Sequence, residues 1–377
     1  MMRRTAGWVI VLCLLGTAGV ASGQEIRDLF QFRIGNPGAR SLGFGGAFAA
    51  LADDATAAYV NPAGLVQLVD PEISLEFRFT QFSGPGFSGF DNSTLGFASF
   101  VYPRKRWSVA IYEAGLGRSD NLLGLSSILP GPIIGPRASS FLEVTNRGLA
   151  GAYRWSETFS IGLGVAQFEG DFNATSQRFF GPGAAGPVEQ FLTVTTVEDT
   201  DVSLNAGFRW QRPGRWTFGG FFRQGPSFVL DSRRIAVTED PPGEELLELD
   251  PRIPFDLADV FGLGAVFQTV NGNFTASFEW DRVGSAGGLE SGDELHVGVE
   301  FILVKKKRVL ALRLGAWVDP ARHSGEISDF PVLFPDGNDR VHVAAGLGFA
   351  FKNLKIDIAF DRAERVDTGS LSFVYAF

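Results

Sequence analysis

Apolar and polar residues alternate along most of the chain from residue 72 onward. In EISLEFRFT, one face carries apolar side chains and the other polar ones: Ile73, Leu75, Phe77 and Phe79 against Ser74, Glu76, Arg78 and Thr80. The same alternation recurs in GNFTASFEWDR, LHVGVEFIL, RVLALRLGAWVD, VHVAAGLGFAF, LKIDIAFD and SLSFVYAF. Since successive side chains of a strand point to opposite faces, this pattern predicts an all-β fold whose strands each have one apolar face.

The lengths and spacing of these segments favour a barrel in a membrane over a soluble sandwich. The alternating segments run about 9 to 12 residues, the length of a tilted membrane-crossing strand. Six short connections are expected at 103–106, 155–157, 212–214, 270–272, 305–307 and 352–353. Seven longer ones are expected at 83–92, 116–140, 172–190, 236–257, 283–291, 320–339 and 363–368. These connections predict a closed, 14-stranded antiparallel transmembrane β-barrel over 72–377, in which 191–211 and 215–235 bend or continue beyond the membrane.

The first 23 residues have the features of a secretory signal peptide. Arg3 and Arg4 precede an apolar run, and Ala21 begins a small-residue exit. The apolar run is short for a membrane-anchoring helix, which needs about 20 residues. Cys13 is the only cysteine and lies inside this run, so we expect no disulfide and no thiolate metal site in the mature protein.

Composition and charge narrow the function. The protein has 36 Phe and 47 Gly but only 5 Tyr, and this density of Phe requires a large apolar environment. The formal net charge is −9, and loss of the two arginines of the leader makes it more negative. An acidic protein is a poor match for nucleic acid, whose phosphates bind basic surfaces.

Residues 24–71 differ in character from the strands that follow. Glycine and alanine dominate, and the alternation is absent. The segment is either a periplasmic extension or a plug folded inside the barrel, where glycines allow close packing. Asp53 and Asp54 are expected to cap a short helix, and Asn61 before Pro62 to end it with a side-chain hydrogen bond to the backbone.

Part of this segment resembles a known family. The run NPGARSLGFGGAFAALADDATAAYVNPAGL is similar to the N-terminal hatch of the FadL/TodX outer-membrane transporters of long-chain fatty acids and aromatic hydrocarbons. The closing strands, from DELHVGVEFIL to the C-terminus, resemble that family too, whereas 116–250 matches no motif. The resemblance implies a hatch domain over 24–71 that occludes a fourteen-stranded barrel, with an Asn-Pro-Ala motif at its closure. The hatch residues it implies are Gly43, Gly45, Gly46, Asp53, Asp54, Asn61, Pro62, Ala63 and Gly64.

The resemblance also implies passive uptake of hydrophobic compounds. A ligand would land among the outer loops, move to a site near the hatch and leave through the barrel wall into the membrane. An alternative follows from the same resemblance: PorV-like relatives share hatch and barrel but bind exported proteins in type IX secretion, as shuttle or scaffold components.

One expected outer loop suits the landing of an apolar ligand. An exposed apolar cluster there indicates an interaction site, although it could equally pack against neighbouring loops. Either arginine of the loop could pair with a carboxylate head group, but a solvated arginine is the simpler interpretation. The loop residues are Arg118, Leu122, Leu123, Leu125, Ile128, Leu129, Ile133, Ile134 and Arg137.

The last strand carries a signal for assembly. Phe373 and Tyr375 share a face with the terminal Phe377, and this ending resembles the signature recognised by the barrel-assembly machinery. The expected partners are therefore that machinery, outer-membrane lipids and a hydrophobic small molecule.

No catalytic or cofactor site is expected. His296, His323 and His342 lack the spacing of a metal site or catalytic triad, and His296 and His342 are expected to point into the lumen. No phosphate-binding loop, nucleophile elbow or dinucleotide motif occurs. We therefore expect no enzyme activity, no cofactor and no metal.

Overall fold

The computed structural model describes most of the protein that follows the leader. The expected signal peptide lies outside the described residues, and so do His323 and several residues of the predicted landing loop. The described ranges are 35–84, 87–124, 137–180, 189–230, 232–239, 242–247, 253–286, 290–306, 308–322, 339–364 and 366–377.

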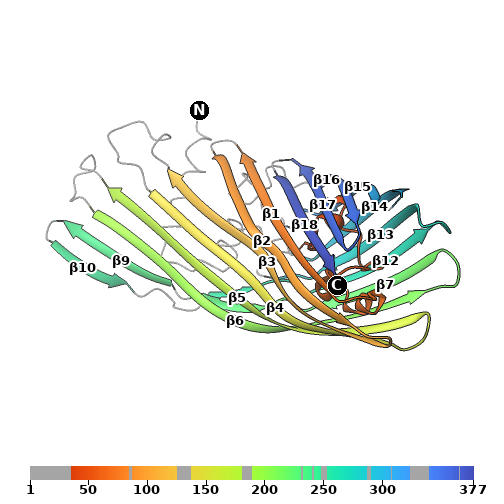
Figure 1. The fold of residues 1–377 in the computed structure, drawn as a ribbon. Coiled ribbons are helices and arrows are strands. Elements are labelled where there is room, and N and C mark those ends of the chain that lie inside the picture. Colours follow the sequence, from red (N-terminus) through yellow and green to blue (C-terminus); the bar gives the residue numbers. More distant parts are fainter. Residues whose placement is uncertain are drawn as a thin grey trace.

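The described strands close into a barrel of fourteen antiparallel strands (Figure 1). Neighbours in the ring follow the order β6-β5-β4-β3-β2-β1-β18-β17-β16-β15-β14-β13-β12-β7, and β7 pairs with β6 to close it. The first strand also pairs with the last, from Glu72↔Ala376 to Phe82↔Val366. The ring strands are β1 (Glu72–Gly84), β2 (Phe87–Pro103), β3 (Trp107–Gly124), β4 (Arg137–Arg154), β5 (Phe159–Phe180), β6 (Glu189–Gln211), β7 (Trp216–Arg223), β12 (Val260–Gln268), β13 (Phe274–Val283), β14 (Gly292–Lys305), β15 (Arg308–Asp319), β16 (Arg340–Phe351), β17 (Leu354–Ala363) and β18 (Val366–Ala376). This confirms the predicted strand number and fold class.

Strand β6 reaches past its neighbour in the ring. It pairs with β7 over Asn205–Gln211 and, further along, with β9 (Ser232–Glu239) over Glu189–Thr195. β10 (Pro242–Leu247) adds to β9, and β8 (Ser227–Leu230) pairs with β11 (Ile253–Asp256) in a separate two-stranded sheet. The predicted long segment 191–211 is thus one strand, whereas 215–235 is divided among β7, β8 and β9; that these segments continue beyond the membrane stays a prediction.

Several strands are longer than the predicted length of about 9 to 12 residues, β14 with 14 residues among them. β1 to β6 contain 13 to 23 residues, so much of the predicted loops at 83–92, 116–140 and 172–190 is paired strand. The 236–257 loop likewise contains parts of three strands, and the predicted 363–368 loop includes the end of β17 at Ala363 and the start of β18 at Val366. The loops predicted at 283–291 and 320–339 agree with the strand ends: the first follows β13 and precedes β14, and the second follows β15 and precedes β16. The short connections also lie where expected.

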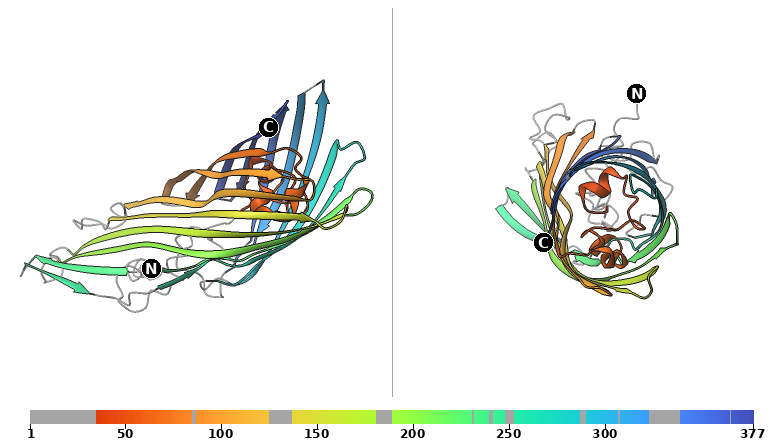
Figure 2. Two further views of the ribbon diagram at one scale, coloured as in Figure 1. Left: turned by 60° about the horizontal axis from the view of Figure 1, so that its bottom comes forward. Right: turned by 45° about the vertical axis from the view of Figure 1, so that its right-hand side comes forward.

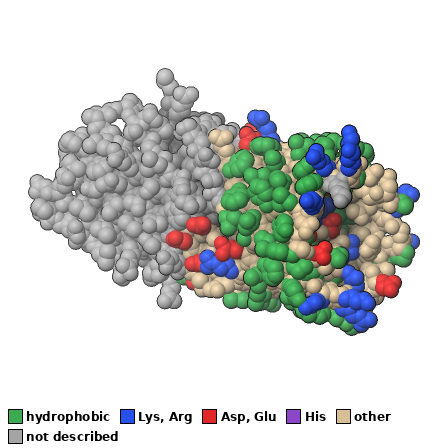
Figure 3. Space-filling view, viewed as in Figure 1, with side chains coloured by type: hydrophobic (Ala, Val, Ile, Leu, Met, Phe, Trp, Pro, Cys, Tyr) green, Lys and Arg blue, Asp and Glu red, His purple; other side chains and the backbone are tan. Residues whose placement is uncertain are grey.

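The outer surface of the ring is apolar. Figure 3 shows a band of apolar side chains across the described part of one face. Where the short turns lie, exposed aromatic rings accompany Lys and Arg of the turns: Trp107, Tyr153, Trp155, Trp210, Trp216 and Tyr375. An apolar band edged by aromatic rings is the surface that a lipid bilayer requires of a barrel.

Residues 35–71, here called the interior segment, lie inside the ring of strands (Figure 2). The segment contains α3 (Ala39–Gly43), α4 (Ala57–Val60) and the 3-10 helix η1 (Pro62–Gln67). Among the described residues, no helix is long and apolar enough to cross a membrane. Most side chains of the segment are fully buried, among them Phe44, Phe48, Tyr59 and Leu65. The interior segment is therefore the core of this barrel.

Candidate functional site

Glycines bring the interior segment into direct contact with the barrel wall. A Cβ on Gly43 would lie 3.0 Å from Gly346 Cα, and one on Gly45 would lie 2.7 Å from Ala316 N. The glycines of the wall leave no space for a side chain either: a Cβ on Gly298 would lie 2.2 Å from Phe44 O. Gly45 and Gly46 also adopt positive φ angles of 65° and 81°, which L-residues with a Cβ rarely adopt. The glycines that resemble the hatch thus allow backbone to meet backbone.

Asn61 links the interior segment both to itself and to the wall. Its Nδ2 donates to Ala49 O at 2.8 Å and to Phe208 O at 3.0 Å, while its Oδ1 accepts from Ala63 N at 3.2 Å. The side chain is completely buried. Gly207 makes room for it, because a Cβ there would lie 2.0 Å from Asn61 Oδ1. The expected hydrogen bond to the backbone is present, although it caps the start of η1 rather than the end of α4.

The rest of the Asn-Pro-Ala motif packs on β5. Pro62 occupies the first turn of η1, where its fixed φ and missing N–H suit a helix start. Ser160 Oγ donates to Ala63 O at 2.9 Å, and a Cβ on Gly162 would lie 2.3 Å from Ala63 N. Gly64 in turn leaves no space for a side chain against Ala52 O. The whole motif is therefore held by contacts on two wall strands.

Asp53 and Asp54 have different roles. Asp54 Oδ1 accepts from Thr56 N at 2.9 Å just before α4, but no side chain caps this helix, so the cap predicted for Asp54 does not form. Asp53 does not cap the helix, because its carboxylate pairs with Arg40 at 2.5 Å. The prediction for Asp53 was therefore wrong: a buried guanidinium competes for its carboxylate more effectively than free backbone N–H groups do.

Arg40 is the centre of an ion-pair network that connects the segment to three wall strands. Its Nη2 lies 3.3 Å from Glu300 of β14, which binds Arg313 of β15 at 2.6 Å. Arg313 also binds Asp357 of β17 at 2.5 Å. Burial on its own would lower the pKa of Arg40, but the carboxylates of Asp53, Glu300 and Asp54 outweigh it and raise the pKa. Arg40 therefore remains charged inside the barrel.

Wall carboxylates also accept hydrogen bonds from the backbone of the interior segment. Glu76 of β1 accepts from Gly38 N at 2.8 Å, and Glu279 of β13 accepts from Ala49 N at 2.6 Å. Both side chains are fully buried. Such charge-assisted bonds are stronger than neutral ones. They fix both ends of the run 38–49 to opposite parts of the wall.

The opposite part of the lumen is apolar. Tyr59 of the interior segment packs edge-on against Tyr112 of β3, which stacks with Phe97 of β2. Val144 of β4 and Phe168 of β5 extend the same buried cluster, together with Phe228 of β8. The lumen therefore has a charged side on β13–β17 and an apolar side on β2–β5.

On this apolar side, the pairing between the wall strands β2 and β3 ends early. Their pairing runs only from Pro103↔Ser108 to Phe97↔Ala114. Beyond that point β2 continues along β1 as far as Gly84↔Phe87, and β3 continues along β4 as far as Gly124↔Arg137. The two strands thus separate at Phe97 and Ala114 (Figure 1).

Two β-bulges mark the point of separation. Glu76 pairs with Phe97 and Phe77 with Leu95, so Gly96 is an extra residue in β2. In β3 the register with β4 skips Leu116, between Gly115 and Gly117. Bulges bend a strand and end its pairing. A small pocket lies here, lined by Gly35, Pro37, Tyr59, Arg78, Gly96, Ala114 and Gly115.

The described part of the predicted landing loop is mainly strand. Arg118, Leu122 and Leu123 belong to β3, and Arg137 begins β4. Leu125, Ile128, Leu129, Ile133 and Ile134 lie outside the described residues, so the landing role stays a prediction.

The structure shows where the C-terminus and two of the three histidines lie. Phe377 N donates to Pro71 O at 3.0 Å, next to the closing pair of β1 and β18. His296 and His342 are buried on the inner face of the wall.

Sequence reasoning missed several functional contacts. It identified neither Arg40 nor its partner Glu300, and it did not identify the bulges. Gly96 interrupts the alternation of STLGFASF, which is the usual sequence signal of a bulge.

Comparison with known proteins is informative only at the level of structure. No family model matches this sequence, and no curated protein matches it. Among solved structures, a Pseudomonas aeruginosa FadL homologue aligns with a TM-score of 0.68 and 15% identity, over 92% of this chain and 99% of that one. The toluene transporters TbuX of Ralstonia pickettii (TM-score 0.66, 15% identity) and TodX of P. putida (TM-score 0.64, 12% identity) align over the same shares.

The protein has the FadL fold. The expected resemblance is thus confirmed for the architecture of the barrel. The FadL-like ring has the predicted fourteen strands.

Proposed function

We propose that this protein is an outer-membrane channel for the passive uptake of hydrophobic compounds, with long-chain fatty acids or aromatic hydrocarbons as the substrate class. The observation that carries the proposal is the separation of β2 from β3 beyond Phe97 and Ala114. A barrel wall that is unpaired at this point offers an apolar solute a route from the lumen into the bilayer. The neighbours of known structure, described as a FadL homologue and as toluene transporters, support this proposal.

The apolar side of the lumen supports the same route. Phe168 and Val144 belong to the same buried cluster as Tyr112 and Phe97, which lie next to the end of the β2–β3 pairing. An apolar solute gains about 0.8 kcal/mol for each CH2 that it removes from water. A solute that moves along these side chains avoids the aqueous phase, and its concentration gradient drives the movement.

In this proposal the interior segment acts as the hatch of a domain spanning 24–71. Its hydrogen bonds and ion pairs with the wall hold it across the lumen, so that water and ions are excluded while an apolar solute leaves sideways. The hatch residues are those that resemble the family, with Arg40 added.

The outer-membrane location rests on the outer surface and the two termini. The apolar band edged by aromatic rings suits a bilayer. The leader at 1–23 would export the protein, and Phe373, Tyr375 and Phe377 would present it to the barrel-assembly machinery. The PorV-like alternative gains no support from the structural neighbours, which are described as channels and transporters.

The test removes one bulge. Deletion of Leu116 leaves the remaining β3–β4 pairs unchanged, because this residue is extra in that ladder. We expect β3 to straighten and to pair with β2 beyond Ala114. Uptake of radiolabelled oleate and of toluene into outer-membrane vesicles should then fall to the level of vesicles that lack the protein.

The matched control is Leu116→Ala, which keeps the bulge and should transport like the wild type. Heat-modifiable gel mobility checks that both barrels are folded. A folded deletion variant that still takes up both compounds at the wild-type rate would refute the route through the wall. A wild-type protein that takes up neither would refute the proposed function.

A further inference from the structure

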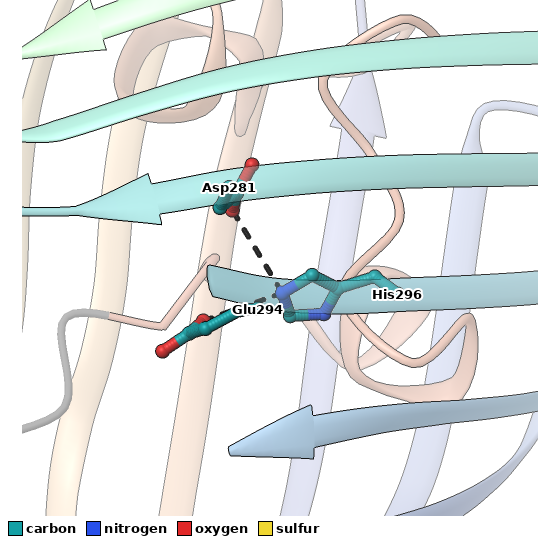
Figure 4. A group of neighbouring side chains, drawn as sticks. All are labelled: Asp281, Glu294 and His296. Atoms are coloured by element: carbon teal, nitrogen blue, oxygen red, sulfur yellow. Dashed lines mark hydrogen bonds and ion pairs between the residues drawn. The ribbon is translucent and has the colours of Figure 1, made fainter. Parts of the chain in front are cut away.

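A group of ionisable side chains faces the interior segment from β13 and β14 (Figure 4). Asp281 of β13 and Glu294 of β14 are directly opposite each other in the ladder, and Glu279 and His296 form the next pair on the same face. Like charges that face each other across a sheet destabilise it. A cation bound beside the Asp281–Glu294 pair would offset this repulsion.

His296 lies beside both carboxylates. Its Nε2 is 3.3 Å from Glu294 Oε2 and 3.8 Å from Asp281 Oδ2. Its Nδ1 lies 2.7 Å from Gly45 O. Since a carbonyl can only accept, Nδ1 carries the proton, and in the neutral ring Nε2 presents a lone pair to the carboxylates. Stacking on Trp317, with ring centroids 5.7 Å apart, fixes the plane of the ring.

Two carboxylate oxygens of this group lack a hydrogen-bond partner among the described residues. Asp281 Oδ1 and Glu279 Oε1 are buried without a hydrogen-bond partner in the described structure, and the Asp281 side chain is only 9% exposed. Arg223 acts electrostatically on both residues. A buried carboxylate oxygen without a hydrogen-bond partner is a group that a bound cation would satisfy.

We propose that Asp281, Glu294 and His296 bind a divalent transition-metal cation, with Zn²⁺ as the best match. Their ligand atoms lie within 4.8 Å of one another. Two ligands of a tetrahedral zinc, each about 2.1 Å from the metal, are about 3.4 Å apart, which suits the two distances from Nε2. One imidazole with two carboxylates leaves the fourth position for water, and a ligand histidine typically donates its other N–H to a carbonyl, as His296 does to Gly45.

The site would anchor the interior segment. A Cβ on Gly46 would lie 2.9 Å from His296 Nδ1, so the segment packs directly on the ligand ring. Glu279 next to the site accepts from Ala49 N at 2.6 Å. A bound cation would fix His296 and with it the run 45–49, so that its removal loosens this run while the strand ladders stay paired.

The experiment titrates the tag-free, detergent-extracted full-length protein, freed of metal with EDTA, with Zn²⁺ in a calorimeter. We expect saturable binding of one ion per protein molecule. His296→Gln and Asp281→Asn should each weaken binding by at least about tenfold, the loss typical of removing even an outer partner of a metal ligand. The matched control is His342→Gln, which removes a buried histidine from β16 outside the cluster and should bind Zn²⁺ like the wild type.

Two further measurements need no variant. Co²⁺ bound to the wild-type protein should give the visible absorption of a four-coordinate site, and Zn²⁺ should protect the run 45–49 from hydrogen exchange. The proposal is overturned if the wild type shows no saturable Zn²⁺ binding. It is equally overturned if the two cluster variants bind as the wild type does, since the ion would then sit elsewhere and His296 would serve as an ion-pair partner.

Discussion

Asn61 shows how a single amide group can hold a segment inside a barrel. It reaches Ala49 of the same segment, Phe208 of the wall and the first turn of η1. Asn61, Ala49 and Ala63 are completely buried, so the Ala49 carbonyl and the Ala63 N–H have no access to water. Loss of the amide would leave them without partners.

Asn61→Ala should therefore destabilise the docked interior segment by about 2–4 kcal/mol, since each buried polar group left unpaired costs about 1–3 kcal/mol. The measurement is the rate of protease cleavage within the segment in detergent, compared with the wild type. Asn271→Ala is the control, because Asn271 makes one hydrogen bond in an exposed short turn. Equal cleavage rates for the two variants would contradict the assigned role.

The wall glycines allow a second prediction at this scale. A Cβ on Gly315 would lie 2.1 Å from Gly45 N, whereas a Cβ on Gly151 meets only Ser108 O at 3.9 Å. Gly315→Ala should displace the segment and cost about 1–3 kcal/mol, the usual range for overpacking. Gly151→Ala should leave stability near that of the wild type. Thermal unfolding of both variants, followed by heat-modifiable gel mobility, distinguishes them, and equal midpoints would refute the close approach.

Among the elements, the interior segment and the charged strands act as one unit. Arg40 and Arg313 share Glu300, so the network joins α3 to β14, β15 and β17. All three side chains are less than one-fifth exposed. Breaking a buried ion pair costs more than its formation gains, because it leaves a charge without a partner.

Arg40→Gln should therefore release the segment at a cost of about 3–5 kcal/mol, the loss typical of a broken buried pair. Hydrogen exchange of 38–54 would report the release, while the strand ladders stay protected. Arg147→Gln is the matched control, since Arg147 also pairs with two carboxylates, Glu113 and Glu169, but is 58% exposed. An unchanged exchange pattern in Arg40→Gln would show that the network does not hold the segment.

The element scale also shows what the sequence could predict. Alternation identified the ring strands because one face of each meets an apolar environment. It failed for the ends of β2 to β5, such as DFNATSQRFF of β5, because neither face there is consistently apolar. The strand length beyond the apolar band depends on pairing with a neighbour, which hydrophobic periodicity does not report.

The candidate site was predictable only where the contacts are local. Asn61 and Asp54 bond within their own segment, and both were expected to do so. Arg40 and Glu300 are 260 positions apart, and Asp281 meets Glu294 only through the register of β13 with β14. Such pairs depend on how the segment and the strands are placed in three dimensions.

In the molecule as a whole, the two sides of the lumen have different proposed roles. The charged side on β13–β17 holds the interior segment, and the apolar side on β2–β5 leads to the separated strands. The separation lies where Tyr59 of the segment contacts Tyr112. In the proposed function, blocking the axis and providing a route through the wall are therefore roles of different sides of one ring.

This division predicts that the ring and the interior segment can be separated experimentally. The ladder from β1 to β18 closes through strand pairs that do not include residues 35–68. A variant that lacks 35–68 should still form a barrel, because closure satisfies the backbone of every ring strand. Its charged inner wall would then face water across an unblocked lumen.

We therefore expect the shortened variant to conduct ions in planar bilayers, whereas the full-length protein should show no stable conductance. Ala110→Ser, a small polar change on the inner face of β3, is the control and should remain silent because the segment stays in place. A full-length protein that conducts as strongly as the shortened one would show that the interior segment does not seal the axis. A silent shortened variant that is folded by gel mobility would show that the strands themselves close the lumen.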